Sequence, residues 1–230
     1  VIRSVLTHLG YELSETVLDG PSLGSLEKRK RLCMVATTPG ICGPVDFEQL
    51  VPVRQKEEKL ADVLDFVPVD SDRWKSYDYL ATKETRDKAS GKGFMRQLLT
   101  GEEDGCGVLG RGYAKARSTE PFIVAPHDSN LSRLLTPAEH ARVKTIPENL
   151  IEGLSATTAH EVLGQSVIFS AFIAVGELIA KTVKGLVVPL KNTNVAQQEE
   201  TAGPVEAPKQ APAPQANIAP ATMPLFALTA

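Results

Sequence analysis

The amino-acid sequence predicts an α/β protein that carries an irregular module and a disordered tail, and three observations support this fold class. A helix-like segment, a strand, a loop and a second strand open the chain, which is the order of an α/β sheet. A long stretch without steady periodicity follows, and regular helical patterns return near Leu135. The final residues are rich in Ala and Pro, so they cannot bury enough surface to offset chain entropy.

The first 40 residues predict one helix and two strands. Apolar residues recur at helical spacing between positions 2 and 9, and Gly10 follows where helices commonly end. Residues 11–18 alternate and carry β-branched side chains, which predicts a strand. Residues 19–25 are rich in Gly, Pro and Ser and predict a loop, and residues 31–37 predict the second strand.

The irregular module covers residues 41–130. Gly and Pro are scattered through it, and its hydrophobic runs are short. Residues 57–66 predict a short helix, while residues 83–96 and 110–117 are basic, contain glycine and predict two basic loops. Taken alone, charge runs of this kind are most often solvated surface.

Regular structure returns in residues 131–186. Thr136, Pro137 and Glu139 have the spacing of a capping box, which predicts a helix of about ten residues. A polar linker then leads to an apolar helix that ends near Lys184. Apolar positions cover most of its circumference, so we expect this helix to be buried against a sheet. The Ala- and Pro-rich disordered tail is expected at 187–230.

Composition narrows the classes of function. Hydrophobic residues make up 42% and charged residues 23% of the 230 residues, which is the balance of an ordinary globular protein. The net charge of −3 means that any nucleic acid must be met by a local patch of Lys and Arg. The three cysteines lack CxxC spacing, so we expect a reducing cytoplasm, no disulfide framework and no metal site. The longest apolar stretch, 167–180, is shorter than the roughly 20 residues that span a bilayer, and no membrane partner is expected.

Three segments, in this order, resemble the C-terminal part of the DNA cytosine-5 methyltransferases. The first segment, residues 24–31 (Gly-Ser-Leu-Glu-Lys-Arg-Lys-Arg), looks like the family's Gly-x-Pro-Gln-x-Arg-x-Arg motif. The second segment, residues 133–147, resembles the later Arg-x-Leu-Thr-x-x-Glu helix, whose loop ends in a proline. The third segment, residues 164–167 (Gly-Gln-Ser-Val), resembles the last motif, usually Gly-Asn-Ser-Val.

The resemblance implies a domain organisation. Residues 1–40 and 131–186 would belong to a Rossmann-like catalytic domain, the second range as helices that return to it. The irregular module, residues 41–130, stands where the family keeps its target recognition domain. Double-stranded DNA is therefore the expected partner.

The first segment carries three candidates for DNA contact. Arg29 and Arg31 stand two residues apart on an extended chain, where side chains point to the same side. They can present two planar guanidinium groups to phosphates or to a base edge, or they can form surface salt bridges. The resemblance implies that they hold the DNA strand and the flipped cytosine. Glu27 replaces the family's usual Gln, and because a carboxylate repels phosphate, we expect Glu27 to face Arg29 or a neighbouring lysine.

The same resemblance implies a function for the two basic loops of the module. Their cationic side chains and one tyrosine can line a DNA-facing cleft, where phosphate contacts position the module and a few side chains read bases. The candidates are Lys88, Lys92, Arg96, Arg111, Tyr113, Lys115 and Arg117.

The third segment carries the candidates for cofactor contact. We expect it at a helix N-terminus, where free backbone N–H groups suit a polar or anionic ligand group, or serve as a simple helix cap. The resemblance implies that the cofactor is S-adenosylmethionine and that Gln165, Ser166 and Val167 close its pocket. Gln165 replaces the usual Asn and keeps the amide.

Methylation of cytosine at carbon 5 in a duplex also requires a thiolate nucleophile and an acid near the ring nitrogen. The family's nucleophile lies in a Pro-Cys pair, but in this chain the residues before the three cysteines are Leu32, Ile41 and Gly105. There is also no Glu-Asn-Val triplet and no Gly-rich loop after a first strand. We therefore assign no catalytic residue.

By motif order, the missing elements are expected to precede Val1, in the same chain or in a separate subunit. The sequence then predicts the C-terminal portion of a DNA methyltransferase from a prokaryotic cell or a phage, with a role in restriction-modification. The alternatives are a non-catalytic DNA-binding protein and the small subunit of a split methyltransferase.

Overall fold

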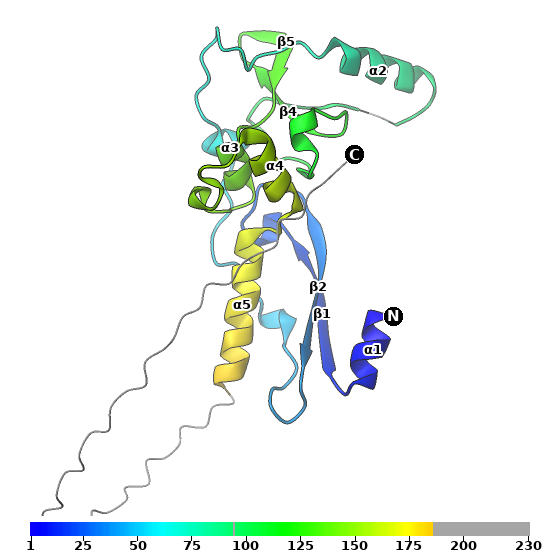
Figure 1. The fold of residues 1–230 in the computed structure, drawn as a ribbon, viewed down its shortest axis with the longest axis vertical. Coiled ribbons are helices and arrows are strands. Elements are labelled where there is room, and N and C mark those ends of the chain that lie inside the picture. The colour runs from blue at the N-terminus through cyan, green and yellow to red at the C-terminus, as the bar shows by residue number, and fades with distance from the viewer. Residues whose placement is uncertain (94, 186–230) are drawn as a thin grey trace, which may run out of the picture. The chain divides into compact units, whose positions relative to one another are not determined.

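The computed structural model describes residues 1–93 and 95–185, all within one compact unit (Figure 1). The tail expected at 187–230 lies outside the described residues. The described part combines helices with a two-stranded sheet and a three-stranded sheet.

The first sheet is an antiparallel hairpin preceded by a short helix, as the sequence predicts. Helix α1 (Ile2–His8) is followed by Gly10, whose φ of +85° lets the chain turn directly into β1 (Glu12–Asp19). Strand β1 pairs with β2 (Lys30–Thr37) in a register that joins Glu12 to Thr37 and Asp19 to Lys30. The loop between the strands contains one 3-10 turn.

The second sheet lies in the irregular module. Strand β3 (Gln97–Leu99) is parallel to β4 (Pro121–Ala125), and β4 is antiparallel to β5 (Asp128–Arg133). A single bridge between Lys75 and Ser132 attaches the segment before helix α2 (Asp78–Ala89) to this sheet.

Two local predictions for the module are wrong. The helix expected at 57–66 is only a 3-10 turn, Leu60–Val63, because the N–H groups of Leu60 and Ala61 donate to Glu103 and Gly101 carbonyl oxygens, each at 2.8 Å. The basic loop expected at 83–96 begins inside helix α2 (Asp78–Ala89). That helix contains no Gly or Pro, so nothing breaks it before its C-terminus.

The predicted capping box is confirmed. Thr136 Oγ1 accepts the Glu139 N–H at 3.1 Å, and Glu139 Oε2 accepts the Thr136 N–H at 2.7 Å, which starts α3 (Pro137–Val143). The helix is shorter than the ten residues expected, because Thr145 adopts a φ of +61° and turns the chain away.

The last helical stretch consists of α4 (Ala156–Gln165) and α5 (Phe169–Lys184), with a 42° bend between them. The prediction that the third segment opens a helix is wrong. Gly164 and Gln165 end α4, Ser166 is its C-cap, and α5 starts only after Val167. Of the described helices, none alone is long and apolar enough to cross a membrane; only the bent pair passes that test.

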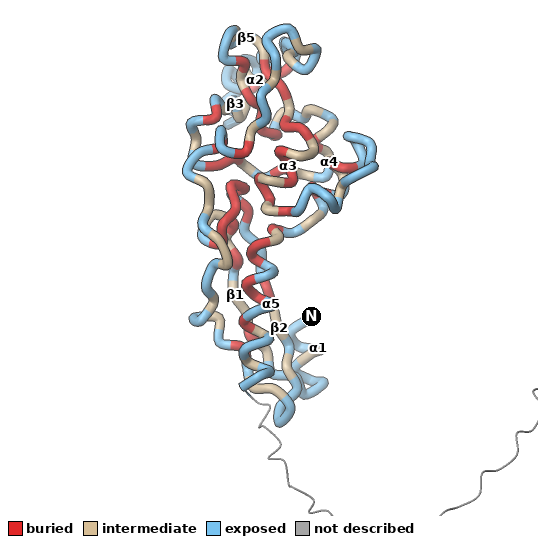
Figure 2. The backbone as a smooth tube through the Cα atoms, turned by 90° about the vertical axis from the view of Figure 1, so that its left-hand side faces the viewer, coloured by how far each residue is buried: buried red, intermediate tan, exposed pale blue. Residues whose placement is uncertain are grey.

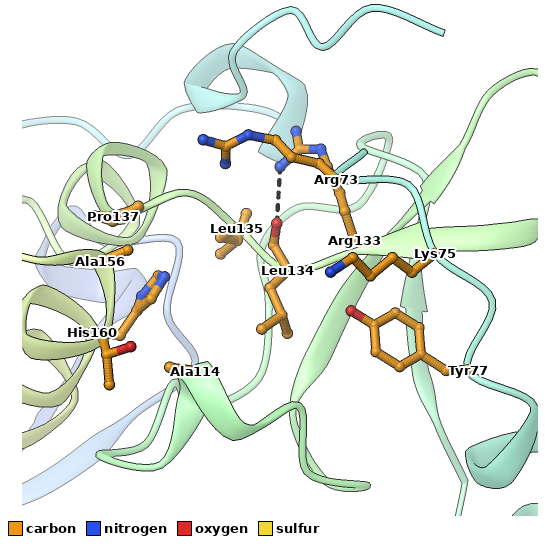
Figure 3. Close-up of a pocket in the computed structure, with 11 residues that line it drawn as sticks. Arg73, Lys75, Tyr77, Ala114, Arg133, Leu134, Leu135, Pro137, Ala156 and His160 are labelled. Carbon is orange, nitrogen blue, oxygen red and sulfur yellow. Dashed lines mark hydrogen bonds between the residues drawn. The ribbon is translucent and has the colours of Figure 1, made fainter. Parts of the chain in front are cut away.

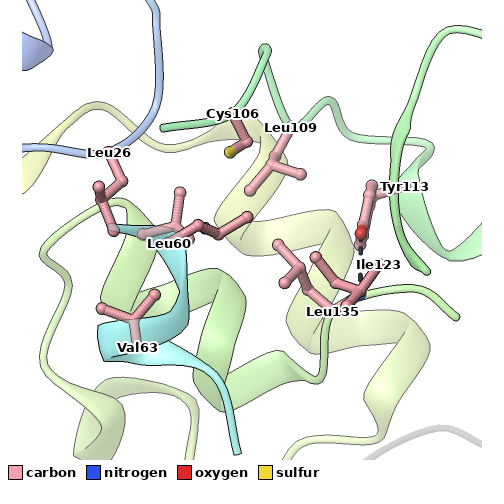
Figure 4. Packing of buried hydrophobic residues seen from close by; sticks show 9 residues of the cluster. Leu26, Leu60, Val63, Cys106, Leu109, Tyr113, Ile123 and Leu135 are labelled. Carbon is pink, nitrogen blue, oxygen red and sulfur yellow. Dashed lines mark hydrogen bonds between the residues drawn. The ribbon is translucent and has the colours of Figure 1, made fainter. Parts of the chain in front are cut away.

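A first buried cluster joins all three ranges that the sequence analysis separated (Figure 4). In this cluster, residues of the module pack against α3 and against the loop before β2. Its members are Leu26, Leu60, Val63, Cys106, Leu109, Tyr113, Ile123, Leu135 and Val143. The division into domains at residues 40 and 130 therefore stays a prediction.

A second buried cluster places α5 along the β1–β2 hairpin, as Figures 1 and 2 show. Ala171, Ala174 and Val175 pack against Leu18 and Cys33 of the hairpin. The expected burial against a sheet holds for this face of α5 only, because side chains on other faces remain exposed: Phe172, Ile173 and Val183.

Candidate functional site

The first motif segment and the start of α5, which follows the third segment, both contact residues 143–145 of the second segment. From the first segment, Ser25 Oγ donates to the Val143 carbonyl oxygen at 2.8 Å. Just after the third segment, the Phe169 N–H donates to the Lys144 carbonyl oxygen at 3.1 Å. Carbonyl oxygens of the second segment thus hold the first segment and the start of α5.

A charge cluster lies at this meeting point, and we call Glu27, Arg29 and Lys144 the Glu27 cluster. The Glu27 side chain is completely buried. Its Oε1 accepts the Leu109 N–H at 2.8 Å and lies 3.4 Å from Arg29 Nη1, and its Oε2 lies 3.1 Å from Lys144 Nζ. The expectation that Glu27 faces Arg29 or a lysine is confirmed. Direct DNA contact by Glu27 is not, because the side chain has no exposed surface.

Burial shifts the ionisation of groups around the Glu27 cluster. Burial lowers the pKa of Lys144, and although Glu27 opposes this shift, the charge of Arg29 reinforces it. Burial, together with the charge of Glu27, raises the pKa of Cys106 to about 12. The Cys106 thiol is therefore neutral near pH 7 and unsuited to act as a nucleophile.

Arg29 and Arg31 do not form the matched pair that the sequence predicts. Arg29 is 8% exposed and its guanidinium turns inward to Glu27, whereas Arg31 lies on β2 and is exposed. The reason is that Arg29 precedes β2, where strand alternation does not yet apply, and a buried carboxylate attracts it. Arg31 remains the candidate of this motif that DNA can reach.

Three candidates of the module gather in one pocket. Arg111, Lys115 and Arg117 line it together with Gly112 and Glu161. Arg111 Nε donates to Glu161 Oε1 at 2.7 Å, so part of its charge is balanced. Among the described residues, Lys115 has no side-chain hydrogen bond or ion pair, which leaves its ammonium group open to an anion.

The other module candidates lie elsewhere. Lys88 and Lys92 line a separate pocket at the end of α2. Arg96 is half-buried, with its guanidinium carbon 5.6 Å from the centre of the Phe122 ring. The prediction that Tyr113 faces DNA is wrong: the side chain is fully buried, and its hydroxyl donates to the Pro121 carbonyl at 2.9 Å.

The third segment forms the turn between α4 and α5. Ser166 Oγ donates to the Leu163 carbonyl at 2.6 Å, while Gln165 and Val167 have exposed side chains. A Cβ at Gly164 would lie 2.3 Å from the backbone of Gly110, so only glycine lets this turn pack there.

Sequence reasoning missed a further pocket, shown in Figure 3. Arg73, Lys75 and Tyr77 line it from one side and His160 from the other. The available signal was the alternation Arg-x-Lys-x-Tyr, which places three hydrogen-bond donors on one face of an extended chain.

His160 also belongs to a buried histidine pair. Its Nδ1 lies 2.9 Å from Nδ1 of His140, and the two rings stack with centroids 5.2 Å apart. Burial lowers the pKa of His140 to about 2 and that of His160 to about 4. Both rings are neutral near pH 7, and the Nδ1–H of one ring donates a hydrogen bond to Nδ1 of the other.

Comparison with known proteins places this arrangement in context. The family described as C-5 cytosine-specific DNA methylase matches residues 1–181. The type II methyltransferase M1.ScrFI of Lactococcus lactis subsp. cremoris is 27% identical over 188 residues, which are 80% of this chain and 47% of that protein. The type II methyltransferase M.NlaX of Neisseria lactamica is 27% identical over 184 residues, 76% of this chain and 56% of that protein. The chain spans about half the length of the curated relatives it matches.

Solved structures agree on the fold. The Dnmt2 methyltransferase of S. pombe has a TM-score of 0.63 at 18% identity, over 80% of this chain and 61% of that one. The methyltransferase EhMeth of Entamoeba histolytica has a TM-score of 0.56 at 17% identity, over 80% and 57%. The predicted fold class, part of a Rossmann-like α/β methyltransferase, is confirmed.

Proposed function

This chain belongs to the C-5 cytosine-specific DNA methylase family, and from that membership we propose that it is the C-terminal portion of a DNA cytosine-5 methyltransferase. The whole enzyme transfers a methyl group from S-adenosylmethionine to carbon 5 of a flipped cytosine in a specific DNA sequence. This portion supplies DNA recognition and part of the cofactor pocket. The observation that carries the proposal is that the first motif segment and α5, which directly follows the third segment, both contact residues 143–145 of the second segment.

DNA recognition is assigned to exposed cations. Arg31 stands beside the Glu27 cluster and reaches the strand or the flipped base, while Arg29 holds the loop that carries it. Arg111, Lys115 and Arg117 meet backbone phosphates from their shared pocket. Lys88, Lys92 and Arg96 contact DNA from the end of α2.

The cofactor site is shared with another part of the enzyme. S-adenosylmethionine supplies the methyl group when it is bound. In this chain Gln165 offers an amide and Val167 an apolar side chain toward it, and Ser166 retains oxygen lone pairs to accept a hydrogen bond.

The partner part is the N-terminal catalytic part that carries the Pro-Cys pair. An exposed apolar surface supports this partner. Val17 and Leu32 stand opposite each other on β1 and β2 and are 58% and 62% exposed. Helix α1 beside them buries none of its residues. Contiguous exposed apolar side chains mark surfaces that another chain or domain covers.

The matched type II methyltransferases also suggest where the enzyme acts. We place it in the cytoplasm of a prokaryotic cell, encoded by the cell or by a phage, as the modification component of a restriction-modification system. The chemistry of three free thiols suits that reducing compartment.

The test is complementation. The chain is mixed with an N-terminal half of a family member that carries the Pro-Cys pair, and methyl transfer from labelled S-adenosylmethionine to duplex DNA is followed. The proposal requires transfer by the mixture and none by either part alone. A mixture that assembles and binds DNA without any transfer favours the non-catalytic DNA-binding alternative. If the chain proves to be made as a separate polypeptide, transfer by the mixture identifies the small subunit of a split methyltransferase.

A further inference from the structure

The pocket in Figure 3 lies outside every site assigned above, and we call it the Arg73 pocket. Its walls come from the segment before α2, the end of β5 and the first turn of α4. The side chains that matter for its chemistry are Arg73, Lys75, Tyr77, Arg133 and His160.

Backbone contacts fix the segment that carries the cations. The Lys75 N–H donates to the Ser132 carbonyl oxygen and the Ser132 N–H to the Lys75 carbonyl oxygen, both at 3.0 Å. Between the two cations, Trp74 Nε1 donates to the Pro68 carbonyl at 2.9 Å. The positions of Arg73 and Lys75 are therefore built into the fold and do not depend on a free loop.

The pocket has an excess of positive charge. Arg133 is balanced by Glu139, whose two oxygens lie 2.7 and 2.8 Å from its Nη atoms. In the described part of the chain, neither Arg73 nor Lys75 has a side-chain hydrogen bond or ion pair, and no Asp or Glu lines the pocket. Two cations thus line one pocket that no carboxylate lines, while Arg73 also borders a neighbouring pocket that contains Asp65, Glu148 and Glu152.

Further hydrogen-bond donors complete the lining. The Tyr77 hydroxyl forms no hydrogen bond within the described residues, and Figure 3 shows it beside the Lys75 side chain. Ala156 and Thr157 bring the N-terminus of the ten-residue helix α4 to the wall. Arg133 Nε is buried without a hydrogen-bond partner, so one strong donor is still unsatisfied.

We infer that the Arg73 pocket binds a phosphate group. Guanidinium, ammonium, phenol and helix N-terminal N–H groups are the donors that phosphate oxygens accept from, and here they line one pocket whose lining contains no carboxylate. The phosphate comes either from the backbone of bound DNA or from a free phosphate ester. The DNA source rests on the proposed function, whereas the pocket itself does not.

The experiment compares Arg73→Ala/Lys75→Ala with a control of equal charge change, Lys181→Ala/Lys184→Ala on α5. Duplex DNA binding is measured by fluorescence anisotropy at several salt concentrations, and inorganic phosphate binding by calorimetry. The pocket variant should bind duplex DNA about tenfold more weakly, with a salt slope smaller by about one, because hydrogen bonds to charged groups contribute this much. The control should match the unmodified chain.

Two further comparisons identify the source of the phosphate and show whether the pocket variant still folds. Lys75→Arg keeps the charge and should retain most of the phosphate affinity, which separates lost contacts from lost folding. Loss of inorganic phosphate binding with unchanged duplex binding would assign the pocket to a free phosphate ester. If the unmodified chain binds duplex DNA and the pocket variant matches it in both assays, the inference is wrong. If the unmodified chain does not bind duplex DNA, that result counts against the proposed function. Calorimetry with inorganic phosphate would still test whether the Arg73 pocket binds phosphate.

Discussion

Lys144 Nζ lies 3.1 Å from Glu27 Oε2, and both side chains are completely buried. The pair joins the first motif segment to the second, and Arg29 approaches the same carboxylate from the other side. Two cations therefore depend on one buried anion. Removing that anion leaves uncompensated charge in a region of low dielectric, which costs far more than breaking a surface ion pair.

We expect Glu27→Gln to destabilise the chain by about 3 kcal/mol, because the amide keeps the shape but not the charge that Lys144 and Arg29 require. Urea unfolding of the chain and its variant measures the change. The double variant Glu27→Gln/Lys144→Met should recover a large part of the loss, since one uncompensated cation is gone.

The matched control is Glu58→Gln, an exposed glutamate that should change the free energy of unfolding by about 0.5 kcal/mol or less. Equal effects of Glu27→Gln and Glu58→Gln would show that the buried carboxylate does not stabilise this junction.

The parts of the fold that the sequence predicts are those set by neighbouring residues. The α1–β1–β2 order follows from local periodicity, and the start of α3 follows from Thr136 and Glu139 three residues apart. Helix α2 was missed because half of its residues are charged and it lacks an apolar stripe, so it resembled a basic loop.

The histidine pair predicts a pH dependence of stability. The pKa values of His140 and His160 are lowered to about 2 and about 4, so between pH 6 and 4 the unfolded chain binds protons that the folded chain does not. The free energy of unfolding should fall as pH drops, by about 1.4 kcal/mol per pH unit for each histidine. NMR of the imidazole protons checks the cause. Titration of either ring with a midpoint above pH 6 would contradict the buried, neutral pair.

Lys115 should contribute to DNA affinity through phosphate contact. Because its ammonium group has no partner among the described residues, Lys115→Ala should lower the slope of log affinity against log salt by about one. Arg111→Ala should lower it less, since Glu161 already balances part of the Arg111 charge. Lys181→Ala serves as control. A salt response that is flat for the unmodified chain would reject DNA contact by this pocket.

The exposed apolar surface of the hairpin predicts a docking defect. Leu32→Lys places a charge where an N-terminal catalytic part is proposed to pack, while the chain itself should keep its stability because this side chain is 62% exposed. Affinity between the two parts, measured by calorimetry, should drop by tenfold or more. Val51→Lys, at another exposed position, should leave it unchanged. Equal affinities for both variants would place the contact surface elsewhere.

The candidate site was less predictable than the fold, for a physical reason. Arg29 and Arg31 look equivalent in sequence, but Glu27 is buried by tertiary packing, and its carboxylate turns Arg29 inward while Arg31 stays exposed. Tyr113 looked like a residue of the DNA-facing cleft because its neighbours are basic, yet its ring belongs to the buried core. The Arg73 pocket could not be predicted from the sequence, because the pairing of Lys75 with Ser132 is what places its cations in one pocket with His160.

The most direct test of this account concerns Arg31, the one arginine of the first segment that is exposed beside the Glu27 cluster. In the complemented enzyme, duplex binding and the rate of methyl transfer are measured for Arg31→Ala and for Lys30→Ala, an exposed neighbour on the opposite face of β2. We predict that Arg31→Ala slows methyl transfer by far more than it weakens duplex binding, while Lys30→Ala changes the rate little. Equal losses of rate and binding for Arg31→Ala would mean that Arg31 only holds phosphate, and would contradict its assignment to the flipped cytosine.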